Sequence, residues 1–376
     1  MRFRHRDGTL VHLAYCTNVH QAEDLDGVLA QLARYAEPVR DRLGVDRLGL
    51  GLWLARPVAT ELLDDPSALP KLRAELAARG LEVVTLNGFP YQGFHDPVVK
   101  HKVYRPNWTT PERTRYTLDL ARLLAELLPD DAARGSVSTL PLAWRTEWTP
   151  GEQLDLLAEG LGKQSAVTGR PVRVAFEPEP GCVIETTAQA ASLLSEVDKE
   201  WLGVCLDTCH LAVGFEEPAE ALARLQGAGL DVVKLQASCA LEALDPADPD
   251  TRRALESFVE PRFLHQCNEG APPGADDLDA ALSGALPGES PWRVHFHVPL
   301  HADPAPPLTS TRPVLTGALA ELFGGEQART DHIEVETYTW QVLPDAPADD
   351  AGLVAGLAAE LDWTRRQLLE LGLEEA

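Results

Sequence analysis

Several short apolar runs of this chain end in an acidic side chain. Such runs stop immediately before Glu177, Asp207 and Glu336. In a barrel of parallel strands, functional side chains project from the carboxyl ends of different strands, so residues far apart in sequence meet at one mouth. The pattern therefore predicts an α/β fold, a (β/α)8 barrel, with one site at its mouth.

Strand-like runs alternate with stretches of helical periodicity, which is the rhythm of a parallel sheet. The eight runs are 11–15, 48–54, 81–86, 136–140, 172–176, 203–206, 232–235 and 333–335. Intervening stretches such as 110–128, 151–168, 188–197 and 218–225 are expected to form outer helices, and 351–371 the closing helix. We interpret residues 1–376 as one domain, because α/β barrels often exceed about 250 residues.

A ninth strand candidate, residues 293–298, falls between the seventh and eighth runs. We interpret residues 240–306, which are rich in Pro, Asp and Gly, as an insertion after the seventh strand. This insertion would fold over the barrel mouth as a lid and deliver its histidines from above. The competing interpretation makes 293–298 a barrel strand and removes an earlier one, and the sequence is compatible with both.

Charge and cysteine content exclude several classes of protein. A net charge of -25 opposes nucleic-acid binding, because neutralising phosphates requires clustered Lys and Arg. No apolar run approaches the roughly 18 residues that span a bilayer, and the N-terminus lacks a signal-peptide core. The six cysteines, Cys205 and Cys209 included, have neither disulfide-framework nor zinc-finger spacing. We expect a cytoplasmic protein with reduced thiols that is not embedded in a membrane.

The acidic residues at the ends of the runs have the chemistry of cation ligands. A buried carboxylate such as Glu177 is costly unless it is paired or coordinated. Asp207 and His210, three residues apart at a strand end, can point into one cavity and bind a divalent cation. Glu336 is the expected ligand from the last strand, whereas Glu334 shares its face or points outward to a helix arginine.

Histidines of the insertion are further candidates. Strand alternation places His295 and His297 on one face, so the pair can approach a metal together. His297 is the better candidate, because the turn that follows it would place it at a strand end. The alternative is a histidine pair that faces the interface between lid and barrel.

Polar side chains that follow the first and third runs suit a hydroxylated ligand, because they combine hydrogen-bond donors and acceptors. Glu179, on the same face as Glu177, is also assigned to substrate binding. Alternatively, the segment after the third run simply builds turns. The predicted polyol-binding residues of the two segments are Asn18, His20, Asn87, Tyr91 and His95.

The succession of Glu-Pro, Leu-Asp-Thr-Cys-His and a late Glu-Thr resembles the xylose isomerase-like TIM-barrel superfamily, which includes endonuclease IV-like proteins and sugar epimerases. The resemblance implies that one or more divalent cations bind to Glu177, Asp207, His210 and Glu336. Where the superfamily usually supplies a histidine from strand seven, this chain has Gln236, a poor neutral donor. Either His297 replaces that ligand, or fewer protein groups hold the metal; Gln236 would then face the substrate.

A narrower resemblance is to the EboE family of metabolite traffic proteins, and it runs from about residue 8 to residue 343. It implies a role in making or moving a small metabolite, beside a prenyltransferase-like membrane protein and a cyclase resembling dehydroquinate synthase. The matching segments are 15–20, 86–91 with Phe94 and His95, 103–108, 294–299 and 335–340.

The leading hypothesis is metal-assisted isomerisation or epimerisation of a sugar, sugar phosphate or cyclitol. Mn²⁺ or Zn²⁺ suits the mixed ligand set best, and Mg²⁺ or Co²⁺ is also compatible. Glu177 or Glu336 would exchange a proton with the substrate, and His210 would orient a substrate oxygen or complete the metal shell. The alternative is a carrier or scaffold that hands a polyol-type metabolite to a membrane partner without turnover. A DNA repair nuclease is disfavoured by the charge.

Overall fold

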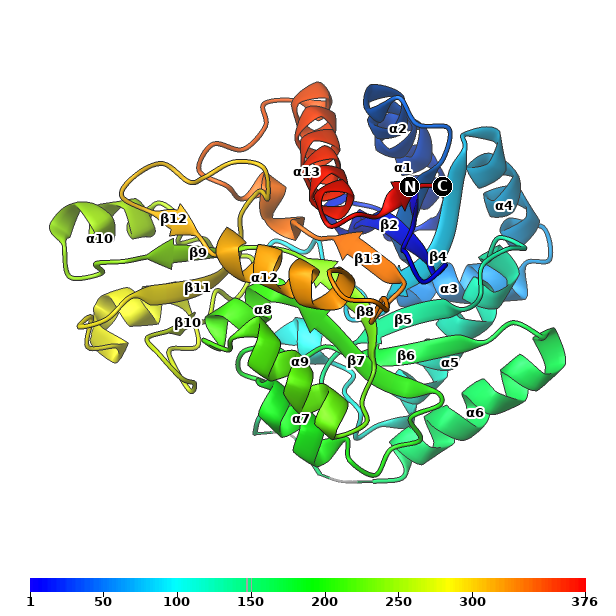
Figure 1. Ribbon diagram of the computed structural model, residues 1–376, viewed down its shortest axis with the longest axis horizontal. Helices are drawn as coiled ribbons and strands as arrows, with labels where there is room; N and C mark the ends of the chain where they lie inside the picture. The colour runs from blue at the N-terminus through cyan, green and yellow to red at the C-terminus, as the bar shows by residue number, and fades with distance from the viewer. Residues whose placement is uncertain (147, 150) are drawn as a thin grey trace.

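The computed structural model describes residues 1–146, 148–149 and 151–376. Within this part of the chain, eight parallel strands close into a barrel, because β13 pairs with both β8 and β2. Figure 1 shows the barrel with its ring of helices. The barrel strands are β2 (Leu10–Cys16), β3 (Leu48–Trp53), β4 (Leu81–Asn87), β5 (Gly135–Thr139), β6 (Val172–Phe176), β7 (Leu202–Asp207), β8 (Val232–Ala237) and β13 (His332–Val335).

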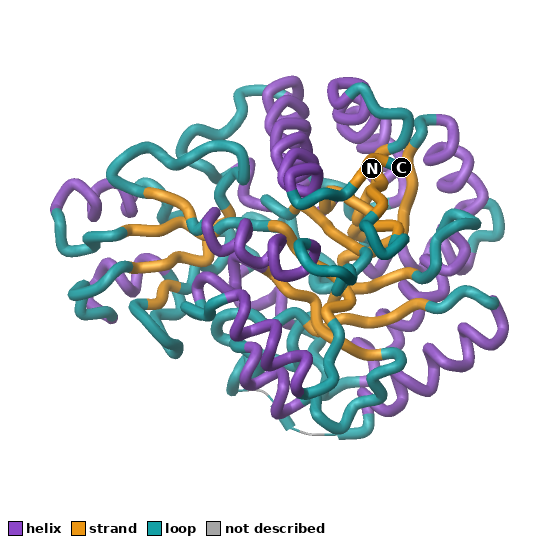
Figure 2. Tube along the Cα trace, in the orientation of Figure 1, coloured by secondary structure: helices purple, strands orange, loops and turns teal. Residues whose placement is uncertain are grey.

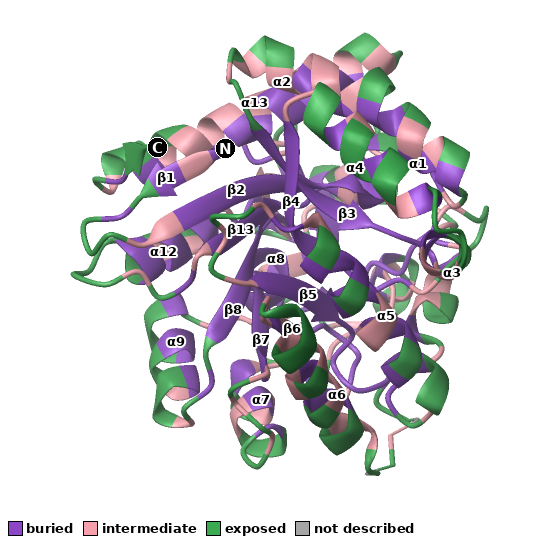
Figure 3. Ribbon diagram, turned by 90° about the vertical axis from the view of Figure 1, so that its right-hand side faces the viewer, coloured by how far each residue is buried: buried purple, intermediate pink, exposed green. Residues whose placement is uncertain are grey.

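Each of the eight predicted runs forms one of these strands. Every residue of β3, β4, β5, β7 and β8 is buried. Burial on both faces is typical of a parallel sheet covered by helices, and it explains why the runs read as continuous apolar stretches. Figure 3 shows the buried strands enclosed by helices whose exposed residues face outward.

Helices follow the barrel strands in the order that the periodicity predicts, and Figure 2 shows them around the strands. In the described residues no helix has both the length and the apolar character needed to cross a bilayer. The helices around the barrel are α1 (Leu25–Gln31), η2 (Leu32–Ala36), α2 (Glu37–Leu43), α3 (Arg56–Asp64), α4 (Ala68–Ala78), α5 (Pro111–Leu127), α6 (Gln153–Thr168), α7 (Thr187–Leu193), α8 (Thr208–Val213), α9 (Pro218–Gly227), α12 (Arg312–Phe323) and α13 (Asp350–Glu370), with short turns η1 (Thr17–Val19), η3 (Lys100–Tyr104) and η5 (Tyr338–Gln341).

A second, antiparallel sheet lies between β8 and α12, at the left of Figure 1, with strand order β10-β11-β9-β12. The candidate ninth strand is β11 of this sheet, so the interpretation that placed it in the barrel is wrong. The sheet continues past the expected boundary at Pro306 to Ser310. Its elements are β9 (Ala240–Ala243), α10 (Pro249–Glu256), β10 (Cys267–Asn268), α11 (Leu278–Ala280), η4 (Ala281–Ala285), β11 (Trp292–His297) and β12 (Thr309–Ser310).

The chain ends meet beside the barrel. β1 (Arg2–Arg4) pairs antiparallel with β2 and with β14 (Glu374–Glu375). All six cysteines are buried and unpaired. This agrees with the absence of a disulfide-framework spacing in the sequence.

An ion pair fills the barrel interior next to the mouth. Lys234 of β8 contacts the carboxylate of Glu334 of β13, and both side chains are completely buried. Glu334 therefore points inward, so of the two alternatives the one in which it faces a helix arginine is wrong. The pair also explains Gly51 of β3, because a Cβ there would lie 1.2 Å from Glu334 Oε1.

We predict that Gly51→Ala destabilises the fold by about 3 kcal/mol, because displacing one partner leaves a buried charge uncompensated. Urea unfolding followed by circular dichroism would measure the loss. Gly227→Ala is the matched control, because a Cβ at Gly227 meets nothing within 4 Å. Equal stability of the Gly51 variant and the parent would contradict this account of the ion pair.

Candidate metal centre at the barrel mouth

Three carboxylates converge where their strands end. Glu177 directly follows β6, Asp207 is the last residue of β7, and Glu336 directly follows β13. One oxygen of each carboxylate lies within 4.8 Å of the others. The parallel arrangement thus brings together residues that are far apart in the sequence, as expected for the carboxyl-terminal face of a barrel.

Hydrogen bonds hold the carboxylate of Asp207 on one oxygen, and one oxygen of Asp207 and one of Glu177 stay open. Asp207 Oδ1 accepts from Ser238 Oγ (2.7 Å) and from the backbone N of His210 (3.0 Å). Asp207 Oδ2 and Glu177 Oε2 are buried and have no hydrogen-bond partner among the described residues. The two open oxygens therefore lack compensation for their burial.

Glu336 is the most heavily bonded of the three. Its Oε1 accepts from Asn18 Nδ2 (2.6 Å) and Asn87 Nδ2 (3.1 Å). Its Oε2 accepts from Gln236 Nε2 at 2.8 Å. Three neutral amides position this carboxylate without neutralising a charge on it.

Burial and mutual repulsion disfavour the ionised forms. Burial, followed by the charges of Glu336 and Asp207, raises the pKa of Glu177 well above its ordinary value. Burial, followed by the charges of Asp207 and Glu334, raises the pKa of Glu336 to about 8. Carboxylates at this spacing are stable only with protons or a cation between them.

Two histidines face the same space. His210 Nδ1 donates to the carbonyl of Pro178 (2.9 Å), and His297 Nδ1 donates to the carbonyl of Glu336 (2.8 Å). Metal-binding histidines characteristically give their outer N–H to such acceptors. His297 Nε2 is buried and has no hydrogen-bond partner in the part of the chain that the structure describes, and burial lowers the pKa of His297 to about 4, so its ring is neutral. One ligand atom each of Asp207, His210 and His297 lies within 4.8 Å of the others.

These residues fit a divalent cation. Two orphaned carboxylate oxygens and an orphaned imidazole nitrogen converge, and oxygen and imidazole donors suit Mn²⁺, Zn²⁺, Mg²⁺ and Co²⁺. Gln236, at the position of the expected strand-seven histidine, turns its amide to Glu336 instead. His297 enters from β11 of the inserted sheet.

A cavity of about 60 Å³ adjoins the carboxylates and has room for roughly five water molecules. Phe and Tyr side chains from several segments form part of its wall, and the insertion contributes Phe263, Leu264, His295 and His297. The lining residues are Asn18, Asn87, Phe89, Pro90, Phe94, Val99, Lys100, Val103, Tyr104, Glu177, Glu179, His210, Phe263, Leu264, His295, His297, Glu336 and Tyr338.

Of the predicted polyol-binding residues, Asn18, Asn87 and Glu179 line this cavity. His20 does not. Its ring stacks on Tyr35 at 4.2 Å between centroids, and its Nε2 lies 3.1 Å from Tyr15 Oη. It therefore packs behind the mouth as a buried core histidine.

Tyr91 and His95 also lie outside the cavity wall. The Tyr91 ring packs edge-on against Tyr116. His95 lies against Trp53 and Phe94, with ring centroids 5.5 and 5.6 Å away. Their loop points the neighbouring Phe89 and Phe94 at the site instead.

A chain of polar contacts on the insertion side was not predicted from sequence. Tyr104 Oη donates to Glu179 Oε1 (2.7 Å), and Gln266 Nε2 donates to Tyr104 Oη (3.0 Å). Burial raises the pKa of Glu179 to about 7. Glu179 had a sequence signal in its position two residues after Glu177, and Tyr104 lies in the matching segment 103–108. Gln266 lies in an irregular segment that no motif marks.

We predict that the cation-free protein loses stability as the pH rises from about 7 to about 8, above the ordinary pKa of the buried histidines, whose lowered pKa values act in the opposite direction at lower pH. The pKa of Glu336 is about 8 in the folded protein and lies above the ordinary value of 4.5, so the folded protein keeps a proton on Glu336 that the unfolded chain has lost. The stability that this proton contributes is lost as the pH passes the folded-state pKa. Thermal unfolding in chelator should show a falling Tm, with a smaller fall in Glu336→Gln. Added Mn²⁺ should make the Tm depend less on pH. A wild-type Tm that rises across the window would contradict this prediction.

The same fold occurs in solved structures of low sequence identity. A xylose isomerase-like TIM barrel protein from Mycobacterium smegmatis in complex with magnesium has a TM-score of 0.53 and 16% identity, with 96% of this chain and 97% of that chain covered. D-psicose 3-epimerase with D-tagatose, from Clostridium cellulolyticum H10, has a TM-score of 0.51 and 14% identity, covering 95% and 99%. A xylose isomerase domain protein from Planctomyces limnophilus has a TM-score of 0.50 and 15% identity, with 89% of this chain and 92% of that chain covered. These likenesses show the fold.

Among curated proteins, none matches the sequence of this chain. A family model described as xylose isomerase-like TIM barrel matches residues 42–259, which is more than half of the 376 residues. The match includes Glu177, Asp207 and His210 and ends before the histidines of β11. The chain belongs to the xylose isomerase-like TIM-barrel family.

Proposed function

We propose that this protein is a divalent-cation-dependent isomerase or epimerase that acts on a sugar, sugar phosphate or cyclitol. The observation that carries the proposal is the convergence of three buried carboxylates, two of them with an open oxygen, beside a cavity that Glu177 and Glu336 line. The ketose epimerase among the similar structures agrees with this substrate class.

The cation would be held by Glu177, Asp207 and Glu336, with His210 and His297 as imidazole ligands. Mn²⁺ and Zn²⁺ suit this mixture of donors best. When bound, a divalent cation polarises a substrate carbonyl and its neighbouring hydroxyl, which acidifies the C–H bond between them.

Proton transfer falls to the carboxylates. Glu177 Oε2 is free of hydrogen bonds, and Glu177 lines the cavity, so this oxygen can accept a proton from a substrate carbon. Glu336 is fixed by three amides and lines the same cavity, so it can return a proton to the substrate. Together they provide the base and the acid that inversion or migration at a carbon requires.

Recognition of hydroxyl groups would come from the amides at the mouth. Asn18 lines the cavity, and its Oδ1 is buried without a partner among the described residues. Such an acceptor suits a substrate hydroxyl. Phe89, Phe94 and Phe263 exclude water from the reacting carbon. Because the cavity holds only a few waters, a sugar enters only if the wall, including Phe263 of the insertion, moves outward.

The segments that resemble metabolite traffic proteins support a place in a small-metabolite pathway. On this basis we also propose a membrane prenyltransferase-like partner, and the six unpaired cysteines support a cytoplasmic location. A non-catalytic carrier is the second candidate, because Gln236 replaces a histidine and uses its amide on Glu336. A carrier would bind the polyol but exchange none of its C–H protons.

We predict that the Mn²⁺-loaded protein exchanges a substrate C–H proton with solvent deuterium, and that Glu177→Gln lowers the rate at least ~10³-fold because the base is lost. Proton NMR in heavy water, over a panel of ketoses, their phosphates and inositols, would detect the exchange. Glu360→Gln is the matched control, because Glu360 is a buried carboxyl whose pKa burial raises to about 7, but it lies outside the cavity wall. Binding of a panel member without exchange would favour the carrier.

A further inference from the structure

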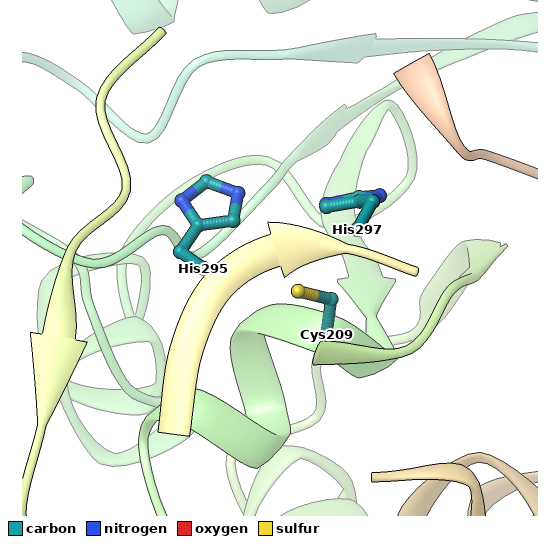
Figure 4. Close-up of side chains that lie close together, drawn as sticks. All are labelled: Cys209, His295 and His297. Atoms are coloured by element: carbon teal, nitrogen blue, oxygen red, sulfur yellow. The ribbon is translucent and has the colours of Figure 1, made fainter. Parts of the chain in front are cut away.

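A second group of candidate ligands adjoins the carboxylates. Cys209 of α8 and His295 and His297 of β11 each place one ligand atom within 4.8 Å of the others. Figure 4 shows the two histidines on their strand and the cysteine on the adjacent helix. Relative exposures of 0%, 4% and 1% place all three side chains out of reach of bulk solvent. The group joins a helix of the barrel to a strand of the insertion.

The orientation of His295 is set by its outer nitrogen. Gln266 Nε2 donates to the carbonyl of Pro180 (2.8 Å), so the amide oxygen of Gln266 faces His295. His295 Nδ1 lies 2.7 Å from that oxygen and therefore carries the hydrogen. This leaves the lone pair of the neutral ring on Nε2.

His210 has the same arrangement. Its Nδ1 donates to Pro178, so its lone pair is also on Nε2. The two Nε2 atoms lie 3.0 Å apart. Two lone pairs at this distance repel each other unless cations engage them, His210 beside the carboxylates and His295 on the side of Cys209. Outer N–H groups anchored on oxygen acceptors are the usual support of metal-binding imidazoles. This observation is independent of the grouping with Cys209.

The inserted sheet is irregular at this point. The pairing of β11 with β9 shifts register between Val294 and His297, the interval that contains His295. Such bulges redirect side chains next to functional sites. His297, whose Nε2 has no partner among the described residues, lies on this segment. The ring centroids of His295 and His297 are 5.4 Å apart.

We propose that Cys209, His295 and His297 form a second cation site, suited to Zn²⁺ or another borderline-soft cation. Thiolate and imidazole donors select Zn²⁺, whereas the carboxylate group beside them suits harder cations such as Mg²⁺ or Mn²⁺. Coordination by the thiolate releases the thiol proton to solvent. The second site goes beyond the proposed isomerase activity, which requires only the carboxylate group.

His297 belongs to both groups of candidate ligands, so its ring couples the two sites. With the second site filled, Glu177, Asp207, Glu336 and His210 hold the first cation. The family match ends at residue 259, so both β11 histidines lie outside it. The insertion thereby adds a site to the barrel.

Cobalt titration of the reduced, metal-free protein tests the proposal. The wild type should bind two Co²⁺ per chain and develop a thiolate-to-cobalt charge-transfer absorption. Cys209→Ser should abolish this absorption and weaken one of the two equivalents at least ~100-fold, because even a residue behind a ligand changes affinity 10- to 100-fold. Cys239→Ser, which removes another fully buried thiol, should keep both equivalents and the absorption.

A Glu177→Gln/Glu336→Gln double variant separates the two sites. This variant should lose the Co²⁺ equivalent that binds at the carboxylates and keep the thiolate-to-cobalt absorption. Wild-type protein that takes up no thiolate-bound cobalt, or absorption that survives in Cys209→Ser, would overturn the second site. One equivalent bound without the absorption would also overturn it, while leaving the proposed isomerase site intact.

Discussion

The carboxylate of Glu336 is the interaction on which the barrel mouth depends. It accepts amide hydrogen bonds from Asn18 after β2, Asn87 at the end of β4 and Gln236 in β8. Its own carbonyl accepts from His297 of the insertion. One residue at the end of the closing strand therefore connects three other barrel strands and the inserted sheet. Because this carboxylate is buried among other acids, the mouth is complete only when protons or a cation compensate it.

The insertion changes the chemistry of the mouth. The barrel strands contribute carboxylates and amides, whereas two of the three clustered imidazoles come from β11. The inserted segment also supplies Phe263 and Leu264 to the cavity wall. Gln236 of β8 turns its amide to Glu336, and the imidazole of His297 reaches the carboxylates from outside the barrel. The proposed cation site takes its ligands from the barrel and from the insertion, so it depends on how these two parts pack.

Some predictions followed from local patterns and held. The barrel strands were readable because buried parallel strands are continuous apolar runs with helical stretches between them. The convergence of Glu177, Asp207 and Glu336 could be predicted because each of them ends such a run. His20, Tyr91 and His95 follow strands in the same way, but they pack away from the cavity, since the direction of a loop side chain depends on its neighbours. His20 stacks on Tyr35, a contact between a loop and a helix that no local pattern encodes.

The sequence by itself determined the barrel, the order of its strands and the acidic residues at their ends, because strand periodicity and strand ends are local properties. Only the tertiary structure decided that residues 292–297 belong to a separate sheet, that Glu334 pairs with Lys234 inside the barrel, and that His295 and His297 meet Cys209 and His210. These arrangements depend on the register between strands and on the packing of the insertion against the barrel. Both are set by contacts between residues distant in sequence, where small differences in burial and hydrogen bonding select the partner.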